Sequence, residues 1–594
     1  MTMRLNWKFV LLSFAGISGI LAMTYLFNNP SEVGNIQSRA NMVTHEDRDY
    51  VPEQLPQQYF GAPLHGELTL SGTFAELRSN HFHSGLDFRT GGIEGLPVLA
   101  SADGYISRIR ISSYGFGKAL YIAHPNGYTT VYGHVKDFNG FIQDFAIRKQ
   151  YETQSFDQEL YLLPTDLRVK KGDTIAWSGN TGGSGGPHLH FEIRKSSNDQ
   201  IINPLFFGIK VKDNIEPFIK SILLVHIQEN TANQVGYYPE RLSRQAPPLK
   251  KSKEVLQLPP GKYGLALSGV DYFTDFASRL GINYSKLYVN DRLIFSQDIE
   301  HYLFEETRYI NAHLDYAFLR EKGVRYARLF NTPFNKLKFN RAIDNGIFHV
   351  IAGDTLTIKA VVTDYVGLKD SLVFRVHGNV TAKLGASKPT EYARHWKVKG
   401  NAENKLDMGS FRAVASPGSI LANAQIGYEQ RIAPTGALSA MHCLYGAKIP
   451  LFRAMQVSLK PEKTIPDPTK YVVIYKDPAT GWIQCENGKY LNGWVTASSK
   501  NIGFYYLMAD STKPAVVSHA LGRNLRFRIS DNLSGIAGWN CTVNGQWILL
   551  EYDYKSGNLW GSIPKSIAAG KHALELVVQD KTGNTNIIKR NIQL

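Results

Sequence analysis

Apolar and polar residues alternate with a period of two in short runs across residues 59–210, and this pattern restricts the fold more than any other feature. Turn residues separate the runs, and the Pro-Asn-Gly sequence at 125–127 lies where two of them would form a hairpin. The pattern predicts an antiparallel β domain, with a less regular insert at about 138–167 that could include a short helix. The clearest runs are "GYISRIRI", "ALYIAHP", "YTTVYGHV" and "HLHFEIR".

The chain is long enough for several domains, because a single hydrophobic core rarely grows beyond about 250–300 residues. Its 594 residues include 31 Tyr and 30 Phe, and short alternating runs recur after the first domain, so we expect a mainly β protein. Two later segments, 275–295 and 531–549, each contain an Asp, a Gly-Ile pair and a Val-Asn hairpin turn. Each segment is followed, further along the chain, by a similar strand-like sequence, at 360–367 and at 576–583. This repeat predicts two small β-sandwiches of immunoglobulin-like type.

The first of these two copies is longer than the second and has a helical pattern in an insertion around residues 302–345. These observations give a predicted division of the chain into six segments. The segments are a signal anchor or signal peptide at 1–29, a linker at 30–58, the β domain at 59–210, a sandwich with the helical insert at 211–380, a β-rich domain of unnamed fold at 381–512 and a second sandwich at 513–594.

The sequence of the first 30 residues predicts that the protein is exported. Residues 9–27 form an apolar run without a charge, Arg4 and Lys8 precede it, and the first acidic residue is Glu32. Such a run is long enough for a membrane helix, and the preceding positive charges keep the N-terminus on the cytoplasmic side. We expect an N-terminal membrane anchor, and a protein of the cell envelope on the periplasmic side, anchored to the inner membrane or exported.

Cysteine and charge content exclude several classes of site. Only Cys443, Cys485 and Cys541 occur, so the first 440 residues hold neither a disulfide scaffold nor a cysteine zinc site, and at most one bridge could form later. The formal net charge is +15, without a dense Lys/Arg run. In an exported protein this charge favours an anionic envelope polymer as partner, and we expect no nucleic acid.

Five side chains of the 59–210 region form the candidate site. His83 and Asp87 are spaced H-x-x-x-D, His134 follows in "TVYGHV", and His188 and His190 belong to one strand-like run. Because strand side chains alternate, these last two histidines lie on the same face. They could bind one metal together, or one could bind metal while the other acts on substrate.

The residue types indicate a hydrolytic zinc site. Such sites take three protein ligands and leave one position for water. His83, Asp87 and one of the pair His188 and His190 would supply them, and the remaining histidines would take a proton and stabilise an oxyanion.

Competing motifs lack the required context. "GGSGG" at 182–186 matches a nucleophile elbow around Ser184, but an alternating strand follows where the elbow requires a helix. "THEDRD" lacks the second histidine of a zincin helix, and "DNLSG" and "DKTGN" contain too few carboxylates for an EF-hand loop.

Residues 70–195 resemble the zinc-dependent peptidoglycan endopeptidases of the lysostaphin type, the M23 peptidases. The matching blocks, in family order, are "HFHSGLDF", "LYIAHPNGYTTVYGHV" and "VKKGDTIAWSGNTGGSGGPHLHFEIR". The resemblance implies Zn²⁺ bound by His83, Asp87 and His190, catalysis by His134 and His188, and hydrolysis of peptide bonds in peptidoglycan stems or cross-links by metal-activated water. No ligand position of the family pattern is substituted.

Two other functions remain open from the sequence. The chain could be a catalytically silent envelope scaffold that binds the wall or activates another hydrolase, with an envelope protein partner on its C-terminal domains. It could also be a zinc peptidase that acts on a secreted protein, because the metal site sets the reaction while the surrounding loops set the substrate.

Overall fold

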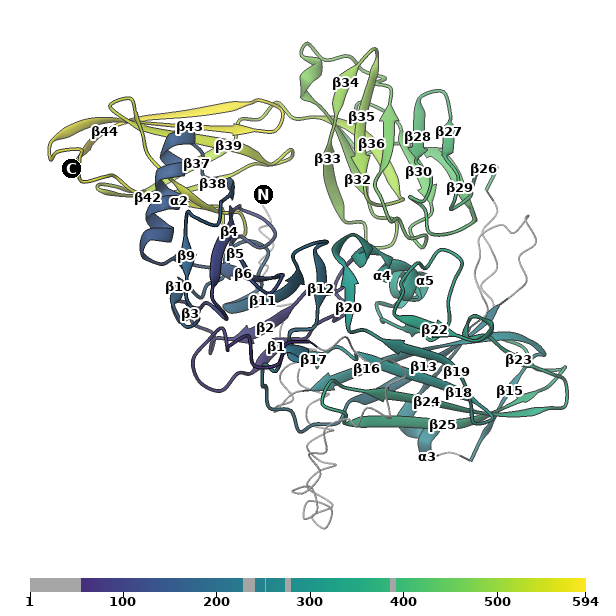
Figure 1. Cartoon of the computed structure of the whole chain (residues 1–594). Coiled ribbons are helices and arrows are strands. Elements are labelled where there is room, and N and C mark those ends of the chain that lie inside the picture. The colour runs from purple at the N-terminus through teal and green to yellow at the C-terminus, as the bar shows by residue number, and fades with distance from the viewer. Residues whose placement is uncertain (1–54, 228–240, 252, 273–278, 385–391) are drawn as a thin grey trace. The chain divides into compact units, whose positions relative to one another are not determined.

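The computed structural model of the chain describes residues 55–227, 241–251, 253–272, 279–384 and 392–594 (Figure 1). The predicted signal segment, and the predicted linker up to residue 54, lie outside these ranges. Within the ranges, every helix is too short or too polar to cross a membrane.

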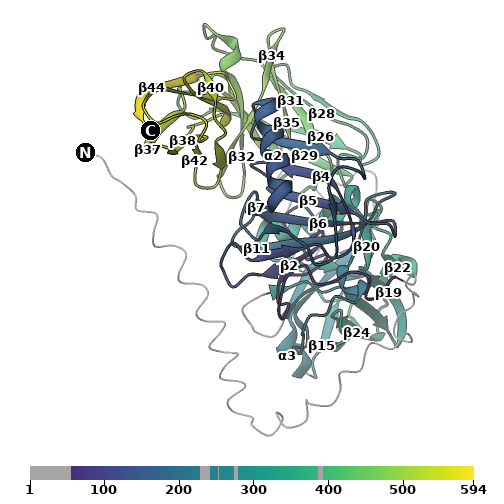
Figure 2. The same ribbon diagram turned by 60° about the vertical axis from the view of Figure 1, so that its left-hand side comes forward.

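The 59–210 region is built on one ten-stranded sheet, and seven of its strands follow one another in the order β1-β2-β11-β6-β5-β4-β8. Each neighbouring pair along this path is antiparallel, which confirms the predicted arrangement. In Figure 2 the strands β2, β11, β6, β5 and β4 can be followed in this order. The seven strands are β1 (Leu70–Gly72), β2 (Leu86–Arg89), β4 (Gly104–Ile111), β5 (Lys118–Ala123), β6 (Tyr128–Val135), β8 (Gln158–Tyr161) and β11 (His188–Lys195).

The predicted hairpin and the predicted insert are both present in this region. β5 and β6 pair across the Pro-Asn-Gly turn, where Gly127 has a φ of +83° that favours glycine. The insert contains one helix, α2 (Gly140–Thr153), which buries Ile142 and Ala146 in the core of the region.

Strand β11 is buried on both of its faces. Leu189, Phe191 and Ile193 are fully buried in the hydrophobic core, and alternation places His188, His190, Glu192 and Arg194 on the opposite face. On that second face His190, Glu192 and Arg194 are also buried, so the polar face of this strand is a site inside the protein and not a solvated surface.

We expect Leu189→Ala to lower the free energy of unfolding of the region by about 2–5 kcal/mol, because the substitution leaves a cavity beneath the histidines. Urea unfolding of the full chain measures this effect. Leu163, whose side chain is 67% exposed, gives the matched control: Leu163→Ala should change the free energy by less than about 0.5 kcal/mol. Equal effects of the two substitutions would contradict the assignment of Leu189 to the core.

The insertion around residues 302–345 is helical, as predicted, and packs against the 59–210 region. Strand β20 (His301–Leu303) extends the ten-stranded sheet by pairing with β12 (Gln200–Ile202). Tyr302 and Ile310 belong to the same hydrophobic core as β11. The helical elements of the insertion are η4 (Phe304–Tyr309), α4 (Ile310–His313) and α5 (Tyr316–Lys322).

The described strands between residues 218 and 378, apart from β20, form two sheets that share a hydrophobic core, and the strands of residues 515–593 do the same. The strands correspond in order: β13-β16 matches β37-β38, and β18-β24-β25 matches β39-β43-β44. The two segments that resemble each other in sequence therefore form equivalent strands. These strands are β13 (Phe218–Ile227), β16 (Gly261–Tyr272), β18 (Tyr284–Val289), β24 (Thr355–Thr363), β25 (Lys369–Gly378), β37 (Ala515–Leu521), β38 (Asn524–Ser530), β39 (Ile536–Val543), β43 (Lys571–Asp580) and β44 (Thr585–Gln593).

The Val-Asn motif is a hairpin turn in both copies, as the sequence predicts. Asn290 and Asp291 have φ values of 48° and 61°, and Asn544 and Gly545 have φ values of 49° and 79°. Two successive positive φ values are typical of the tight hairpin turn that matches the twist of the strands.

Between the two copies, residues 394–509 form two further sheets around a core of their own. Cys443, Cys485 and Cys541 are all free thiols, so none of the three forms a bridge. The strands of the two sheets are β26 (Arg394–Val398), β29 (Ala424–Arg431), β30 (Met441–Tyr445), β36 (Phe504–Ala509), β32 (Tyr471–Lys476) and β33 (Ile483–Asn487), and then β27 (Asn404–Asp407), β28 (Phe411–Ala415), β31 (Met455–Leu459), β35 (Trp494–Ser499) and β34 (Lys489–Leu491).

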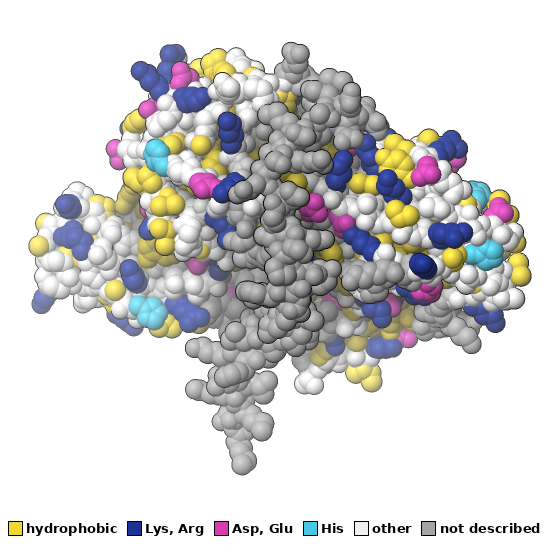
Figure 3. Space-filling model, turned by 90° about the horizontal axis from the view of Figure 1, so that it is seen from below, with side chains coloured by type: hydrophobic (Ala, Val, Ile, Leu, Met, Phe, Trp, Pro, Cys, Tyr) yellow, Lys and Arg dark blue, Asp and Glu magenta, His cyan; other side chains and the backbone are white. Residues whose placement is uncertain are grey.

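The excess of positive charge is spread over the surface in view. On the face in Figure 3, Lys and Arg side chains are interspersed with acidic, polar and apolar ones. This agrees with the absence of a dense basic run in the sequence.

Candidate metal centre

Three of the five predicted side chains meet at one point. One ligand atom each of His83, Asp87 and His190 lies within 4.8 Å of the others. Asp87 Oδ1 is 2.9 Å from both His83 Nε2 and His190 Nδ1, and these two nitrogens are 3.1 Å apart. All three side chains are buried.

Sheet register brings the two motifs together. On the neighbouring strands β2 and β11, Asp87 and His190 are directly opposite each other, and opposed side chains lie close enough to share a ligand. His83 precedes Asp87 by four residues, in the loop that leads into β2. The H-x-x-x-D and H-x-H motifs therefore form one site because their strands are neighbours.

Hydrogen bonds fix which nitrogen of each histidine faces this point. His83 Nδ1 donates to the carbonyl oxygen of Thr73 at 2.7 Å, and His190 Nε2 donates to the carboxylate of Glu192 at 2.9 Å. Each ring therefore turns its other nitrogen, Nε2 of His83 and Nδ1 of His190, toward Asp87. Such outer contacts orient metal-binding histidines and raise their basicity.

The carboxylate of Asp87 is ionised at neutral pH. Burial alone would raise its pKa, but the neighbouring histidines hold the pKa well below its usual range. Its other oxygen, Oδ2, accepts a hydrogen bond from Arg78 at 2.9 Å, which leaves Oδ1 to face the two imidazoles. The group thus presents two nitrogens and one negatively charged oxygen.

Glu192 is charged as well. Burial would raise its pKa, but Arg194 and then His190 lower it to about 2. Burial would lower the pKa of His190, whereas hydrogen bonds to Asp87 and Glu192 raise it to about 9. The carboxylates around His190 therefore favour positive charge at this ring, whether a proton or a metal ion supplies it.

His134 and His188 lie beside the three converging side chains. Their ring centroids are 4.9 Å apart, and the His134 ring is 5.8 Å from that of His190. His134 Nδ1 donates to the carbonyl oxygen of Thr181 at 2.9 Å, and its φ of 61° is rare for a non-glycine residue. Burial, and then the two neighbouring histidines, lower the pKa of His134 to about 3, so its ring is neutral.

His188 points to the same centre as His190, as the alternation predicts. Its Nδ1 donates to the carbonyl oxygen of Gly186 at 2.8 Å, and its Nε2 is 3.4 Å from Asp87 Oδ1. The site thus contains all five predicted residues, with His188 and His134 at its edge.

The three converging side chains fit a catalytic zinc ion. Two imidazole nitrogens and one carboxylate oxygen are a donor set that zinc prefers, and three protein ligands leave a coordination position open. The remaining polar atoms of His83, His190 and Asp87 are each held by a fixed partner, so the rings and the carboxylate are oriented in advance.

Ser184 does not have the surroundings of a nucleophile. Strand β11 follows it, as expected, and its hydroxyl donates to the carbonyl oxygen of Gly186 at 2.7 Å. In the same turn, Gly182 has a φ of +67° and a Cβ there would lie 2.3 Å from the backbone nitrogen of Gly117. These glycines therefore allow two loops to pack closely beside His188.

Arg78, Glu192 and Arg194 support the site from outside and were not predicted from the sequence. A signal for two of them was present, because the alternation that places His188 and His190 on one face continues to residues 192 and 194. Their burial could not be read from the sequence, since the same pattern also describes a strand with one solvated face.

We expect Glu192→Gln to weaken zinc binding by about 10–100-fold, because His190 loses the carboxylate that orients it. Competition with a chromophoric chelator measures the affinity. Glu152→Gln on the exposed side of α2 is the matched control and should leave the affinity unchanged. Wild-type affinity in the Glu192 variant would mean that this carboxylate does not support the metal.

Residues beyond the 59–210 region form hydrogen bonds and an ion pair with the segments beside the site. The Tyr302 hydroxyl donates to the backbone carbonyl of His83 at 2.9 Å, and the Lys555 ammonium donates to the carbonyl of Ser184 at 3.2 Å. The buried Lys118 forms an ion pair with Glu551 at 2.9 Å. The loops beside the histidines are therefore held partly by residues outside the 59–210 region.

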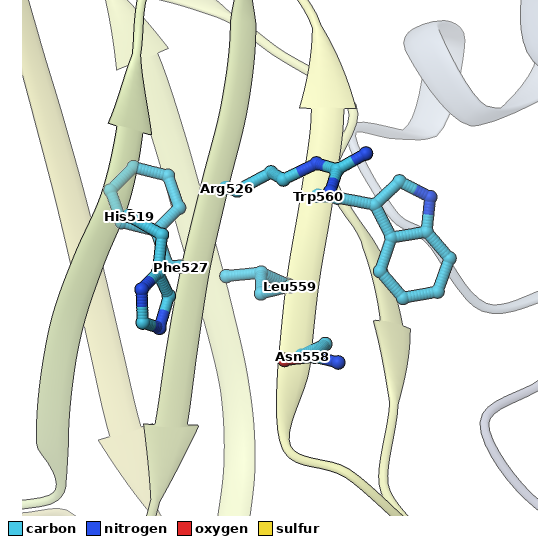
Figure 4. A pocket seen from close by; sticks show the side chains of 6 residues that line it. All are labelled: His519, Arg526, Phe527, Asn558, Leu559 and Trp560. Atoms are coloured by element: carbon cyan, nitrogen blue, oxygen red, sulfur yellow. The ribbon is translucent and has the colours of Figure 1, made fainter.

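A surface pocket of about 440 Å³ on the sheet that contains β37 and β38 is separate from this site (Figure 4). None of its lining residues belongs to the histidine site. They are His519, Arg526, Phe527, Asn558, Leu559 and Trp560.

Comparisons with known proteins agree with the geometry. Residues 81–204 match the model of peptidase family M23, and residues 396–510 match the model of the Zu5-like domain. The first match contains all five predicted site residues and confirms the resemblance stated from the sequence. The second match lies within the β-rich stretch 381–512, for which the sequence predicted no particular fold.

Curated proteins also match the chain, and three of them show the following identity and coverage. An uncharacterized metalloprotease of Haemophilus influenzae is 34% identical over 123 residues, which cover 21% of this chain and 20% of the relative. The DD-carboxypeptidase/endopeptidase Mpg of Neisseria meningitidis is 33% identical over 129 residues (22% and 23%), and the peptidoglycan DD-endopeptidase ShyC of Vibrio cholerae is 31% identical over 99 residues (17% and 17%). The chain thus spans about a fifth of the length of these relatives.

Proposed function

We propose, on the basis of the M23 peptidase domain at residues 81–204, that the protein is a zinc-dependent endopeptidase that cleaves peptide bonds in peptidoglycan stems or cross-links. The observation that carries this proposal is the convergence of His83, Asp87 and His190 on one point. The names of two relatives, a DD-carboxypeptidase/endopeptidase and a peptidoglycan DD-endopeptidase, support peptidoglycan as the substrate.

In this proposal His83, Asp87 and His190 would hold the zinc ion, through the atoms that converge: Nε2, Oδ1 and Nδ1, respectively. When bound, zinc supplies a Lewis acid that polarises a carbonyl and makes water more acidic. Thr73 and Glu192 fix the two imidazole tautomers through the hydrogen bonds described above. The protein thereby orients three ligands before substrate arrives.

His134 and His188 perform the proton transfers and stabilise the developing oxyanion. Both rings donate through Nδ1 to backbone carbonyls, so Nε2 is the nitrogen of each ring that can accept a proton. The neutral state of His134 suits a group that accepts a proton or polarises a carbonyl. Their backbone anchors hold these rings in place during the reaction.

The cellular setting is part of the same proposal. The apolar N-terminal run, together with the envelope substrates named for the relatives, supports a location in the cell envelope with the peptidase on the periplasmic side. We retain the N-terminal membrane anchor and an envelope protein partner for the later domains as predictions.

The test is incubation of the full-length protein with three substrates: a cross-linked muropeptide dimer, an uncross-linked stem peptide and an unfolded secreted protein. Mass analysis of the products identifies the bond that is cleaved. We expect monomers from the dimer, and no cleavage after zinc is removed with a chelator. Cleavage of the unfolded protein alone would replace peptidoglycan with a protein substrate, and no cleavage of any substrate would favour the silent scaffold.

A further inference from the structure

Three aspartates far apart in the sequence meet at one end of the first sandwich. Asp213 precedes β13 by five residues, Asp271 is the penultimate residue of β16, and Asp364 directly follows β24. One carboxylate oxygen of each lies within 4.8 Å of the others. Asp271 and Asp364 are 0% and 1% exposed.

Each carboxylate has one satisfied oxygen and one without a partner. The Oδ1 atoms accept hydrogen bonds from backbone N–H groups of their own loops, at 3.2 Å for Asp213, 2.8 Å for Asp271 and 2.7 Å for Asp364. The three Oδ2 atoms are buried and have no hydrogen-bond partner. A buried polar atom without a partner is costly, so these three oxygens indicate a missing ligand.

The protein supplies no cation to this cluster from the part of the chain that is described. No Lys or Arg there forms an ion pair with any of the three carboxylates. Burial, and then the neighbouring carboxylates, raise the pKa of Asp271 to about 9 and that of Asp364 to about 7. Three carboxylates so close together need a positive ion to be charged at neutral pH.

The donor atoms favour calcium. All three are carboxylate oxygens, which suit Ca²⁺ or Mg²⁺ and not the nitrogen and sulfur preference of zinc. Ca²⁺ binds oxygen at about 2.3–2.6 Å, so two oxygens bound to one ion are at most about 4.6–5.2 Å apart. The three aspartate oxygens lie within 4.8 Å of one another, which fits this range. Mg²⁺ requires shorter bonds and near-ideal octahedral geometry.

We propose that Asp213, Asp271 and Asp364 bind one Ca²⁺ ion. The ion would join the segment that leaves the 59–210 region, through Asp213, to two strand ends of the first sandwich. Its role is structural, because it replaces mutual repulsion of three carboxylates by attraction to a shared ion. It is independent of the zinc site proposed above, which shares no residue with it.

The second sandwich contains a similar cluster of three aspartates, whose carboxylate oxygens have more hydrogen-bond donors around them. It is formed by Asp510, Asp531 and Asp580. Asp510 precedes β37 by five residues, as Asp213 precedes β13, and Asp580 matches Asp364 in the similar segments 576–583 and 360–367. Here Asp580 Oδ2 accepts from the side-chain amide of Asn584 at 2.7 Å.

Protein donors at this second cluster leave only one orphaned oxygen. The Asp510 carboxylate accepts from the backbone N–H of Ser534 at 3.0 Å, and Asp531 Oδ1 alone among the six oxygens has no partner. In the first copy Leu368 occupies the position of Asn584 and has no side-chain donor. We therefore place the ion in the first cluster alone.

The test is calorimetric titration of Ca²⁺ alone, and of Mg²⁺ alone, into the full-length protein. We expect one Ca²⁺ per chain, with weaker Mg²⁺ binding. Asp364→Asn and Asp271→Asn should each weaken Ca²⁺ binding by more than about 100-fold. Loss of a residue that only supports a metal ligand typically costs roughly 10–100-fold, and loss of a ligand itself should cost more. Asp580→Asn is the matched control in the second cluster, and His190→Ala is the control for the zinc site; both should keep one Ca²⁺.

Several outcomes would overturn the proposal. These are no Ca²⁺ binding by the wild-type protein, wild-type affinity in both Asp variants, or loss of binding in Asp580→Asn. Thermal unfolding without Ca²⁺ provides a second measurement that does not depend on titration. Without the ion, Asp364→Asn should be at least as stable as wild type, because the amide oxygen keeps the backbone hydrogen bonds of Asp364 and one carboxyl group fewer has to be buried in the cluster. Ca²⁺ should raise the unfolding temperature of wild type and of the two controls, but not that of Asp364→Asn.

Discussion

We expect His190→Ala to lower kcat/KM on a cross-linked muropeptide by at least about 10³-fold, because several kcal/mol of transition-state stabilisation depend on the metal. His190 is 2% exposed, and its Nδ1 lies 2.9 Å from Asp87 Oδ1 and 3.1 Å from His83 Nε2. Removal of this imidazole leaves two ligands, which do not form the three-ligand set of a catalytic zinc site. The variant should therefore contain much less than one zinc per chain.

Product analysis and metal analysis of the same preparations measure both effects. His65→Ala is the matched control, since His65 is an exposed histidine of the same region and should change neither activity nor zinc content. Circular dichroism separates loss of metal from loss of fold. A His190→Ala protein with a full zinc complement and wild-type turnover would exclude His190 as a ligand.

His188→Ala should lower kcat by about 10²–10⁴-fold while the protein keeps one zinc per chain. The His188 ring is oriented by the carbonyl of Gly186, and its Nε2 is 3.4 Å from Asp87 Oδ1, at the edge of the three converging ligand atoms. Loss of a proton-transfer group removes an interaction that matters in the transition state, so kcat falls with little change in zinc affinity.

This substitution decides the question that the H-x-H spacing leaves open, namely whether both histidines bind the metal. The measurements are kcat on the muropeptide and zinc content of the purified variant. His134→Ala provides the parallel case, because its ring lies 4.9 Å from that of His188 and is also anchored to a backbone carbonyl through Nδ1. A His188→Ala protein that loses its zinc would make His188 a ligand and would reassign the roles.

Much of the fold was predictable because its signals are local. Period-two alternation identified the strands that carry the site, and Pro-Asn-Gly and Val-Asn motifs identified hairpins whose residues have positive φ. The helical pattern in the insertion around 302–345 was also confirmed. The packing of that insertion against the 59–210 core was not predicted, because a contact between Tyr302 and His83 joins residues more than two hundred positions apart.

The sequence alone determined which residues form the histidine site. His83 and Asp87 belong to one spacing motif and His188 and His190 to one strand face, and both patterns depend only on neighbouring residues. The strand register then paired Asp87 with His190, and hydrogen bonds selected the nitrogen that each ring directs toward the centre.

Only the tertiary structure decided which other polar groups are buried and what they face. Glu192 became a support of His190 because the second face of β11 is covered. In the sequence Asp213, Asp271 and Asp364 are separated by 58 and 93 residues, so no local motif joins them. Their oxygens converge only when the two sheets between residues 218 and 378 pack, because strand ends that are distant along the chain then share one end of the same core.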